Sequence, residues 1–189
     1  MSTYKKICIT NRKLVKGDFL EQIKRVLQKE PDLLVLREKD LNETEYEALA
    51  EEVKKLCENS STTLVVHSFP AVARRLGIYW LHMPLAAMRS MAAEEKAYFT
   101  ALGVSVHSAK EAVLAESCAA SYVTAGHVFS TDCKKGVPGR GLSFLKDVCQ
   151  SVSIPVYAIG GIHEDNIKDC ISQGAAGVCM MSEYMNNGI

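Results

Sequence analysis

Short apolar runs alternate with longer amphipathic stretches along the whole chain. The runs are rich in β-branched residues, and the stretches between them have the apolar spacing of helices. The eight predicted strands are 6–10, 33–37, 63–67, 80–83, 103–107, 121–126, 155–160 and 176–181. The predicted helices are 17–29, 43–58, 68–76, 88–100, 108–118, 142–151 and 163–173. The pattern is therefore a strand followed by a helix, repeated along the chain.

This alternation predicts an α/β fold of parallel strands, because strands that are continuously apolar and joined by helices are covered on their outer face. Eight units favour a closed (β/α)8 TIM barrel. A doubly wound sheet uses the same alternation, but with fewer strands and usually a Gly-rich turn after the first strand. Here that turn reads TNRKLVKG. No linker is evident, so residues 1–189 are predicted to form a single domain.

Several residues mark predicted helix boundaries. Asn42 precedes an acidic first turn, Ser108 and Glu111 have the spacing of a capping box, and His163 opens the last long helix. Three glycines stand where helices should end: Gly77, Gly103 and Gly174. After the eighth strand only SEYMNNGI remains, which predicts a shortened or missing final helix. Either this stub or a partner subunit must then cover the barrel.

The composition narrows the class of partner. Twenty-two basic and twenty-two acidic residues give a formal net charge of zero, so no broad charge attracts nucleic acid or an anionic membrane. Seven cysteines without a C-x-x-C pair argue against a disulfide framework and against structural zinc. No apolar run reaches the ~20 residues of a membrane span, and the start lacks the apolar core of a signal peptide. We expect a cytoplasmic protein with a small-molecule ligand.

In a TIM barrel the active site lies at the carboxyl ends of the strands, and here those ends are polar. After the seventh strand, Gly160 and Gly161 allow backbone N–H groups to approach an anion, with Ser182 completing a phosphate site. The alternative is a tight turn that needs glycine only for positive φ. The carboxylate of Glu183 would repel a phosphate bound at this site, so we expect it to point away.

Two cations follow the second strand. Arg37 and Lys39 are two residues apart, so both point into the mouth of the barrel and favour an anionic ligand. Alternatively, they pair with Glu38 and Asp40 as solvated surface charge.

The long loop after the sixth strand carries further candidates. Lys134, Lys135 and Arg140 suit a lid over a bound phosphate or serve only solubility. Cys133, beside Lys134, is either a reactive thiol or a passive loop cysteine.

His127 is the best candidate for general acid and base catalysis, because an imidazole can take and give a proton near neutral pH. His67 and His107 also stand at strand ends, and a structural histidine is the alternative at position 127; His82 and His163 are weaker candidates. For a metal, oxygen ligands are wanted after the third and fourth strands, but the chain has HSFPAV and PLAAM there. We therefore expect no metal and no cofactor.

Four segments together resemble the thiamin phosphate synthase and TenI superfamily. They are LVLREKD, GVSVHSAKEAVLAES, AGHVFSTDCKKGVPGRG and IPVYAIGGIHEDN, and the likeness covers nearly the whole chain in order. The segment GHVFSTDCKKGVPGRG is the specific part, because it resembles the TenI branch, the thiazole tautomerases, in which the catalytic histidine falls on His127. Synthases generally carry a Pro-bearing segment there, and after strands three and four they carry an N-D-R segment and an aspartate that hold magnesium.

The resemblance implies metal-free isomerisation of a carboxythiazole phosphate to its aromatic tautomer, with His127 as the catalytic residue. The residues that the strand ends and the resemblance together place around the ligand are Arg37, Lys39, Ser105, His107, Thr131, Lys134, Gly160, Gly161, Met181 and Ser182.

Two alternatives stay open. One is a synthase that joins hydroxymethylpyrimidine diphosphate to thiazole phosphate, and the other is a non-catalytic regulatory or ligand-binding relative. The short carboxyl end and the family habit both predict a homodimer.

Overall fold

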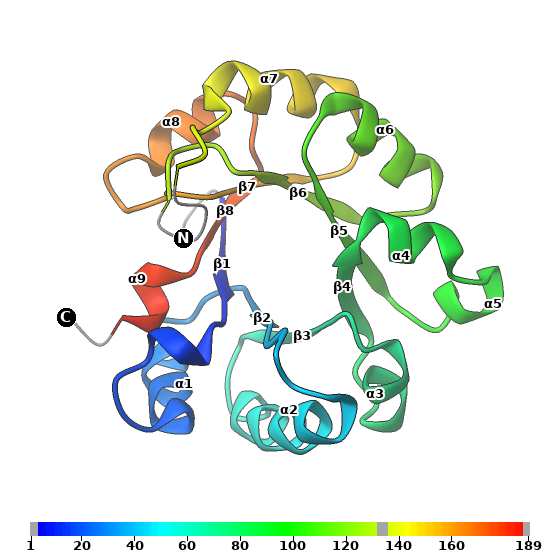
Figure 1. The fold of residues 1–189 in the computed structure, drawn as a ribbon, viewed down its shortest axis with the longest axis vertical. Coiled ribbons are helices and arrows are strands. Elements are labelled where there is room, and N and C mark those ends of the chain that lie inside the picture. The colour runs from blue at the N-terminus through cyan, green and yellow to red at the C-terminus, as the bar shows by residue number, and fades with distance from the viewer. Residues whose placement is uncertain (1–3, 132–135, 187–189) are drawn as a thin grey trace.

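The computed structural model describes residues 4–131 and 136–186, which form a closed barrel of eight parallel strands inside a ring of helices (Figure 1). The strands are β1 (Lys5–Ile9), β2 (Leu33–Leu36), β3 (Thr63–His67), β4 (Trp80–Pro84), β5 (Ala101–Val106), β6 (Tyr122–Gly126), β7 (Val156–Ile159) and β8 (Gly177–Met180). Their order around the barrel is their order in the sequence. The predicted (β/α)8 fold and all eight strands are confirmed.

The helices on the outside are α1 (Phe19–Leu27), α2 (Glu43–Cys57), α3 (Pro70–Arg75), α4 (Leu85–Ser90), α5 (Ala93–Lys96), α6 (Ala109–Ser117), α7 (Gly141–Ser151), α8 (Ile167–Ser172) and α9 (Ser182–Met185). The predicted helix 88–100 is two short helices, α4 and α5, separated by extended backbone at Met91 and Ala92. A 3-10 helix, η1 (Arg12–Leu14), was not expected.

The helix starts predicted at Asn42 and Ser108 are confirmed, although one capping box is incomplete, and the start predicted at His163 is wrong. Asn42 forms the full capping box with Glu45. Ser108 accepts from the N–H of Glu111, but the Glu111 carboxylate accepts from the N–H of His107 instead of completing the box. His163 does not open a helix, because α8 begins four residues later.

The barrel closes where β8 pairs with β1. Ile7 is the register partner of Cys179 on one side and of Leu33 on the other. A small cluster of buried side chains fills the barrel interior, and a larger core lies between the strands and the helices. Gly103 does not end a helix as predicted: it lies within β5, where a Cβ atom would overlap the side chains of Tyr122 and His82. The glycine therefore makes room for two large interior side chains.

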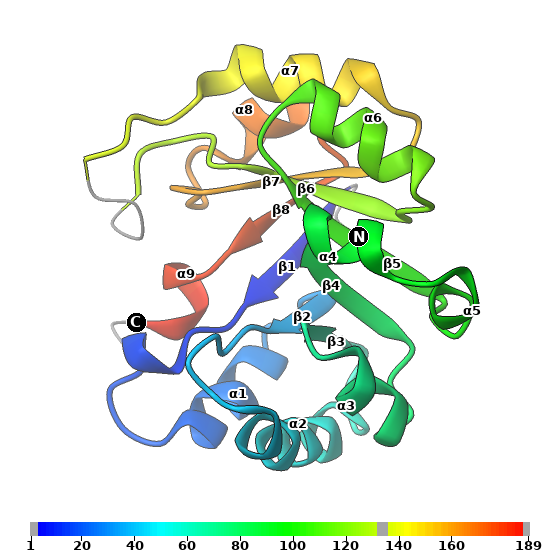
Figure 2. The same cartoon turned by 45° about the vertical axis from the view of Figure 1, so that its right-hand side comes forward.

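The carboxyl end covers this side of the barrel through α9, which lies beside η1 (Figure 2). Tyr184 and Met185 are buried in the main core, and Gln22 of α1 donates a hydrogen bond of 2.6 Å to the carbonyl of Tyr184. The expected shortening is therefore real, and this stub does the covering within one chain. The homodimer stays a prediction.

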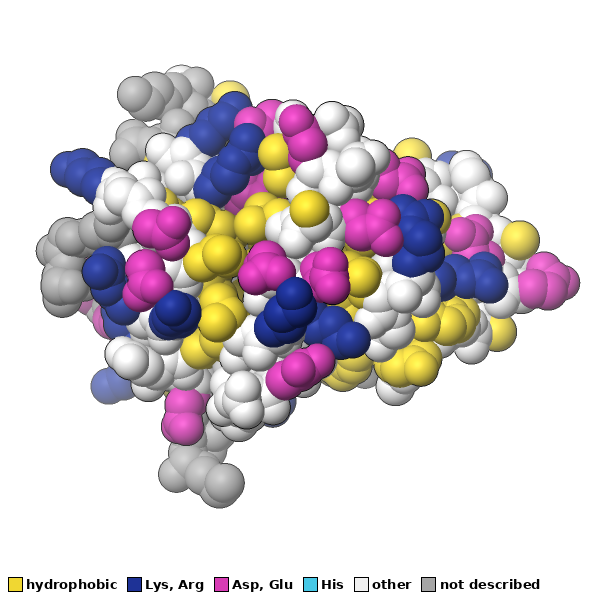
Figure 3. Space-filling model, turned by 90° about the horizontal axis from the view of Figure 1, so that it is seen from below, with side chains coloured by type: hydrophobic (Ala, Val, Ile, Leu, Met, Phe, Trp, Pro, Cys, Tyr) yellow, Lys and Arg dark blue, Asp and Glu magenta, His cyan; other side chains and the backbone are white. Residues whose placement is uncertain are grey.

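The outer surface mixes charges of both signs. On the face seen in Figure 3, acidic side chains lie beside basic ones and form no single basic area. Such pairs include Lys24 with Glu21 on α1 and Lys55 with Glu52 on α2. Within the described part of the chain, no helix is long and apolar enough to cross a membrane.

Met185→Ala tests whether α9 closes the barrel. We expect a loss of about 2–4 kcal/mol in the free energy of unfolding, because the substitution leaves a cavity in the core. Asn186→Ala, at the exposed neighbouring position, is the matched control and should change stability by less than about 0.5 kcal/mol. Denaturant titration measures both. Equal stability of the two variants would show that α9 does not seal this face.

Candidate active site

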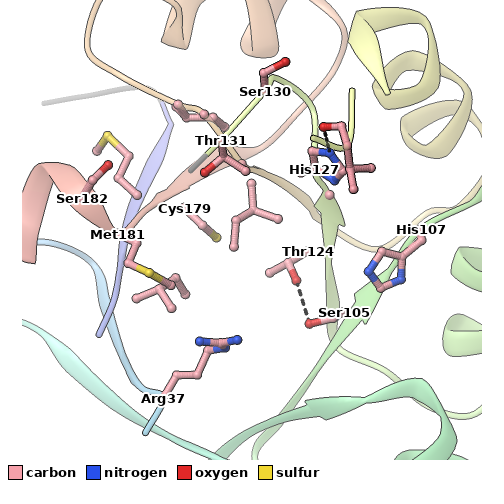
Figure 4. A pocket seen from close by; sticks show the side chains of 18 of the residues that line it. Arg37, Ser105, His107, Thr124, His127, Ser130, Thr131, Cys179, Met181 and Ser182 are labelled. Atoms are coloured by element: carbon pink, nitrogen blue, oxygen red, sulfur yellow. Dashed lines mark hydrogen bonds between the residues drawn. The ribbon is translucent and has the colours of Figure 1, made fainter. Parts of the chain in front are cut away.

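A cavity of about 1080 Å³ opens at the carboxyl ends of the strands. Residues at or just after the ends of all eight strands line it, as the barrel topology requires. Figure 4 shows Arg37 on one side of the cavity and Thr131, Ser182 and His127 on the other. The cavity therefore lies at the strand ends, where the sequence predicted the site.

The residues predicted to surround the ligand come together there. The described ones that line the cavity are Arg37, Lys39, Ser105, His107, His127, Thr131, Gly160, Gly161, Met181 and Ser182. Lys134, Lys135 and Cys133 lie outside the described residues. The ligand contacts of all these residues stay predictions.

The carboxylates of the segment 37–40 are engaged away from the cavity. Glu38 is 2% exposed, accepts a hydrogen bond of 2.6 Å from the hydroxyl of Thr10, and accepts another from the N–H of Arg12. Asp40 pairs with the Arg12 guanidinium at 2.7 Å, and the hydrogen bonds from Arg12 and Lys13 hold the pKa of Asp40 well below its usual range. Glu38 and Asp40 thus form ion pairs with Arg12. Residues 37 and 39, which alternate with them along the segment, line the cavity.

His67 lies at the end of β3 beside those cations. Burial, together with the smaller effect of the nearby charges of Arg37 and Lys39, lowers its pKa to about 4. Its Nδ1 lies 2.9 Å from the hydroxyl of Ser68. His67 is therefore neutral at physiological pH and serves as a polar wall of the cavity.

A second buried histidine, His82, extends this polar wall into the barrel. Its Nε2 lies 2.9 Å from the Ser105 hydroxyl, which also accepts a hydrogen bond of 3.3 Å from Thr124. Its Nδ1 lies 3.4 Å from the hydroxyl of Tyr122. Burial lowers the pKa of His82 to about 3, with a smaller effect from the neighbouring His67. The chain thus carries a neutral hydrogen-bonding network from the barrel interior to the cavity at Ser105 and Thr124.

His127 lines the cavity but is only 4% exposed, and the peptide bond before it is cis. Its Nε2 lies 3.3 Å from the carbonyl oxygen of Val137. Because a carbonyl can only accept, Nε2 carries the hydrogen, and a neutral ring then keeps the lone pair on Nδ1. That Nδ1 is buried and has no hydrogen-bond partner among the described residues. It is the unsatisfied acceptor of the site.

Gly160 and Gly161 are required by the packing of the loop after β6. Both have positive φ, and a Cβ atom would overlap His127 at Gly160 and the carbonyl of Ser130 at Gly161. The N–H of Phe129 also donates to the carbonyl of Gly160 at 3.0 Å. The tight-turn explanation therefore holds for both glycines, and phosphate binding at this turn stays a prediction.

Some cavity residues were missed by the sequence reasoning. Thr124, Cys179 and Asn186 line the cavity but were not singled out. Strand periodicity could have found Thr124, because it is the polar residue two positions before Gly126. The apolar character of Cys179 gave no comparable signal.

The described residues do not suit a magnesium site. They contain no group of three or more His, Cys, Asp or Glu side chains placed to hold a metal ion. Glu111 is the one carboxylate among the described lining residues, and it accepts a hydrogen bond from the backbone of His107.

Acid should unfold the protein partly through its buried histidines. The pKa values of His82 and His67 are about 3 and about 4 in the folded chain, against ~6.5 when unfolded. Their folded pKa values are depressed, so the stability that they contribute is present above pH ~6.5 and is lost as the pH falls toward the folded values. Each histidine should lower the free energy of unfolding by about 1.4 kcal/mol per pH unit in that window.

His82→Gln should reduce the dependence of the free energy of unfolding on pH by the contribution of one histidine. This reduction is expected whether or not the substitution changes stability at neutral pH. His107→Gln is the control, because the His107 side chain is 44% exposed. Denaturant titrations between pH 7 and about pH 4 measure the slopes. An unchanged slope in His82→Gln would show that His82 is protonated in the folded chain.

A family model described as thiamine monophosphate synthase matches residues 7–184. A putative thiamine-phosphate synthase 2 of Aquifex aeolicus is 32% identical over 94% of this chain and 95% of its own length. A thiamine-phosphate synthase of Desulfitobacterium hafniense is 34% identical over 97% of this chain and 90% of its own length. The similarity is therefore not confined to the site.

Among solved structures, a thiamine phosphate pyrophosphorylase from Pyrococcus furiosus superposes with a TM-score of 0.84 at 28% identity, covering 98% of this chain and 89% of that one. The fold and the resemblance to the superfamily are thus confirmed. The main functional prediction, a thiazole tautomerase, is contradicted, because these relatives are named as synthases. The comparisons favour the alternative, in which two substrates are joined.

Proposed function

Because this chain belongs to the thiamine monophosphate synthase family, we propose that it joins a hydroxymethylpyrimidine diphosphate to a thiazole phosphate. Similarity over nearly the whole chain to relatives named as synthases carries the proposal. The cavity of about 1080 Å³ is at the upper end of the ~300–1,000 Å³ usual for ligand pockets, so it has room for two small substrates.

The charges suggest how the two anions divide the cavity. Arg37 lies on one side of the cavity (Figure 4), and Lys39 also lines the cavity, so a diphosphate there would meet cations. Ser182 and Thr131 lie on the opposite side (Figure 4), and with the lining residue Gly161 they would offer a monophosphate hydroxyls and backbone N–H groups. We refer to the segments 160–163 and 181–182 as the phosphate cup.

In this reaction the bond between the pyrimidine methylene carbon and the diphosphate oxygen breaks, and its electron pair leaves with the diphosphate. The thiazole ring nitrogen gives its lone pair to the same carbon. That nitrogen carries no proton, so no proton is lost at the new bond. The protein's contribution is to hold the two rings in line, keep out water and stabilise the leaving diphosphate.

His127 then has a different part from the one predicted. Its Nε2 contacts the carbonyl of Val137 and its Nδ1 is buried, so the ring forms part of the cavity wall. The neutral network of His82, Ser105 and Thr124 supplies further polar contacts deeper in the barrel.

The family resemblance also implies magnesium, and the described residues do not fit it. The ends of β3 and β4 present His67, Ser68 and Pro84, none of which is a carboxylate ligand. Glu38, the nearest buried carboxylate in the segment 37–40, is occupied by Thr10 and Arg12. Arg37 and Lys39 would instead neutralise the charge of the diphosphate.

The direct test is product formation from the two substrates, measured chromatographically in magnesium buffer and in chelator. We expect product in both, because Arg37 and Lys39 would neutralise the leaving diphosphate in place of a metal ion. Absence of product in both buffers, combined with tight binding of thiazole phosphate, would overturn the proposal in favour of a ligand-binding relative.

Arg37→Gln tests the placement of the diphosphate. Hydrogen bonds to charged groups contribute about 1.5–3 kcal/mol, so kcat/KM for the pyrimidine diphosphate should fall about 10- to 150-fold. The KM for thiazole phosphate should change little. Lys168→Gln, which removes an exposed charge from α8, is the control and should leave both constants unchanged. An equal loss for both substrates would argue against the division of the cavity.

A further inference from the structure

An acidic residue stands at the edge of the phosphate cup. Glu183 directly follows Ser182, which lines the cavity, as does Asn186 three residues later. A carboxylate turned toward a bound phosphate repels it, and more strongly at a protein surface than in bulk water. An open Glu183 would therefore weaken anion binding.

The structure gives this carboxylate a partner from the other half of the cup. The Nδ1 of His163, in the loop after β7, is hydrogen-bonded to Oε1 of Glu183 at the start of α9. A carboxylate accepts, so the contact requires a proton on Nδ1 of His163. The pair joins two segments that are 20 residues apart in the sequence.

The backbone around His163 is held independently of this contact. The N–H of His163 donates to the side chain of Asn166 at 3.0 Å, and Asn166 also donates to the carbonyl of Gly161 at 2.9 Å. The other nearby acid, Glu164, pairs with Lys6 at 2.8 Å. Hydrogen bonds within the loop therefore fix the backbone that carries the His163 ring. The charge of Glu164 is already paired with Lys6.

We propose that His163 and Glu183 form a clasp, in which the hydrogen bond from His163 keeps the Glu183 carboxylate turned away from the phosphate bound in the cup. This inference rests on the proposed function for the phosphorylated ligand. His163 acts on the ligand through Glu183, so it is a positioning residue. Its removal should cost affinity because it leaves a carboxylate facing the phosphate, and removing that carboxylate as well should restore the affinity.

A double-mutant cycle tests this directly with His163→Gln, Glu183→Gln and the double variant. Calorimetric titration with thiazole phosphate, and separately with inorganic phosphate, gives Kd for each protein. We expect His163→Gln to raise Kd about 10-fold, corresponding to about 1.4 kcal/mol. Glu183→Gln and the double variant should stay within about 2-fold of wild type, well below the 1.4 kcal/mol of a tenfold change.

The kinetic constants should follow the same pattern. In His163→Gln the KM for thiazole phosphate should rise while kcat is kept, because the loss is in binding. Glu164→Gln is the matched control, since it removes the adjacent acid of the same loop without touching the pair. It should leave Kd and KM unchanged.

Two outcomes would overturn the clasp. One is an unchanged Kd in His163→Gln, and the other is a double variant that binds as weakly as His163→Gln, which would show a purely structural contact. Wild type that binds neither probe would instead overturn the proposed function, on which the clasp depends. Thermal unfolding of all five proteins confirms that each variant is folded when it is titrated.

Discussion

The backbone pairing of β8 with β1 is the constraint on which the rest of this structure depends. Closure leaves no open sheet edge, and it forces every strand of a parallel barrel to end at the same rim. Residues as distant in the sequence as Arg37 and Ser182 thereby face one cavity. The outer side of this junction is sealed by Tyr184 and Met185 of the short α9. A four-residue helix suffices because its two large side chains are buried in the main core.

At this rim, hydrogen bonds hold the acidic side chains of the segment 37–40 away from the cavity that its basic side chains line. Glu38 sits between Thr10 and Arg12, so the acidic members of the segment 37–40 are turned toward η1. The hydroxyl of Thr10 also accepts from the N–H of Arg37, which ties this network to the backbone that carries the cation. The same rim keeps His67 neutral, since both burial and the cations disfavour its protonated form. The cavity therefore presents the cations Arg37 and Lys39 beside uncharged hydrogen-bonding groups.

The sequence was sufficient for the fold and for the location of the site, because strand periodicity and strand ends are local signals. Residues 37 and 39 could be placed in the mouth from their spacing alone. What failed depended on contacts between distant segments. Gly103 looked like a helix end because nothing in its own segment shows that Tyr122 and His82 need its space. The pairing of Glu183 with His163 was equally invisible, although the need to turn that carboxylate away was foreseen. The predicted tautomerase reaction was wrong because it rested on one segment, GHVFSTDCKKGVPGRG, whereas the relatives named as synthases are similar over nearly the whole chain.

The contact between the glycine turn after β7 and the loop after β6 couples two parts of the rim. Gly160 lies against His127, and Gly161 lies against the carbonyl of Ser130, with no room for a side chain at either position. The two segments therefore behave mechanically as one piece. A change that shifts the turn must also displace the imidazole, so variation at either segment is tolerated only when the other accommodates it.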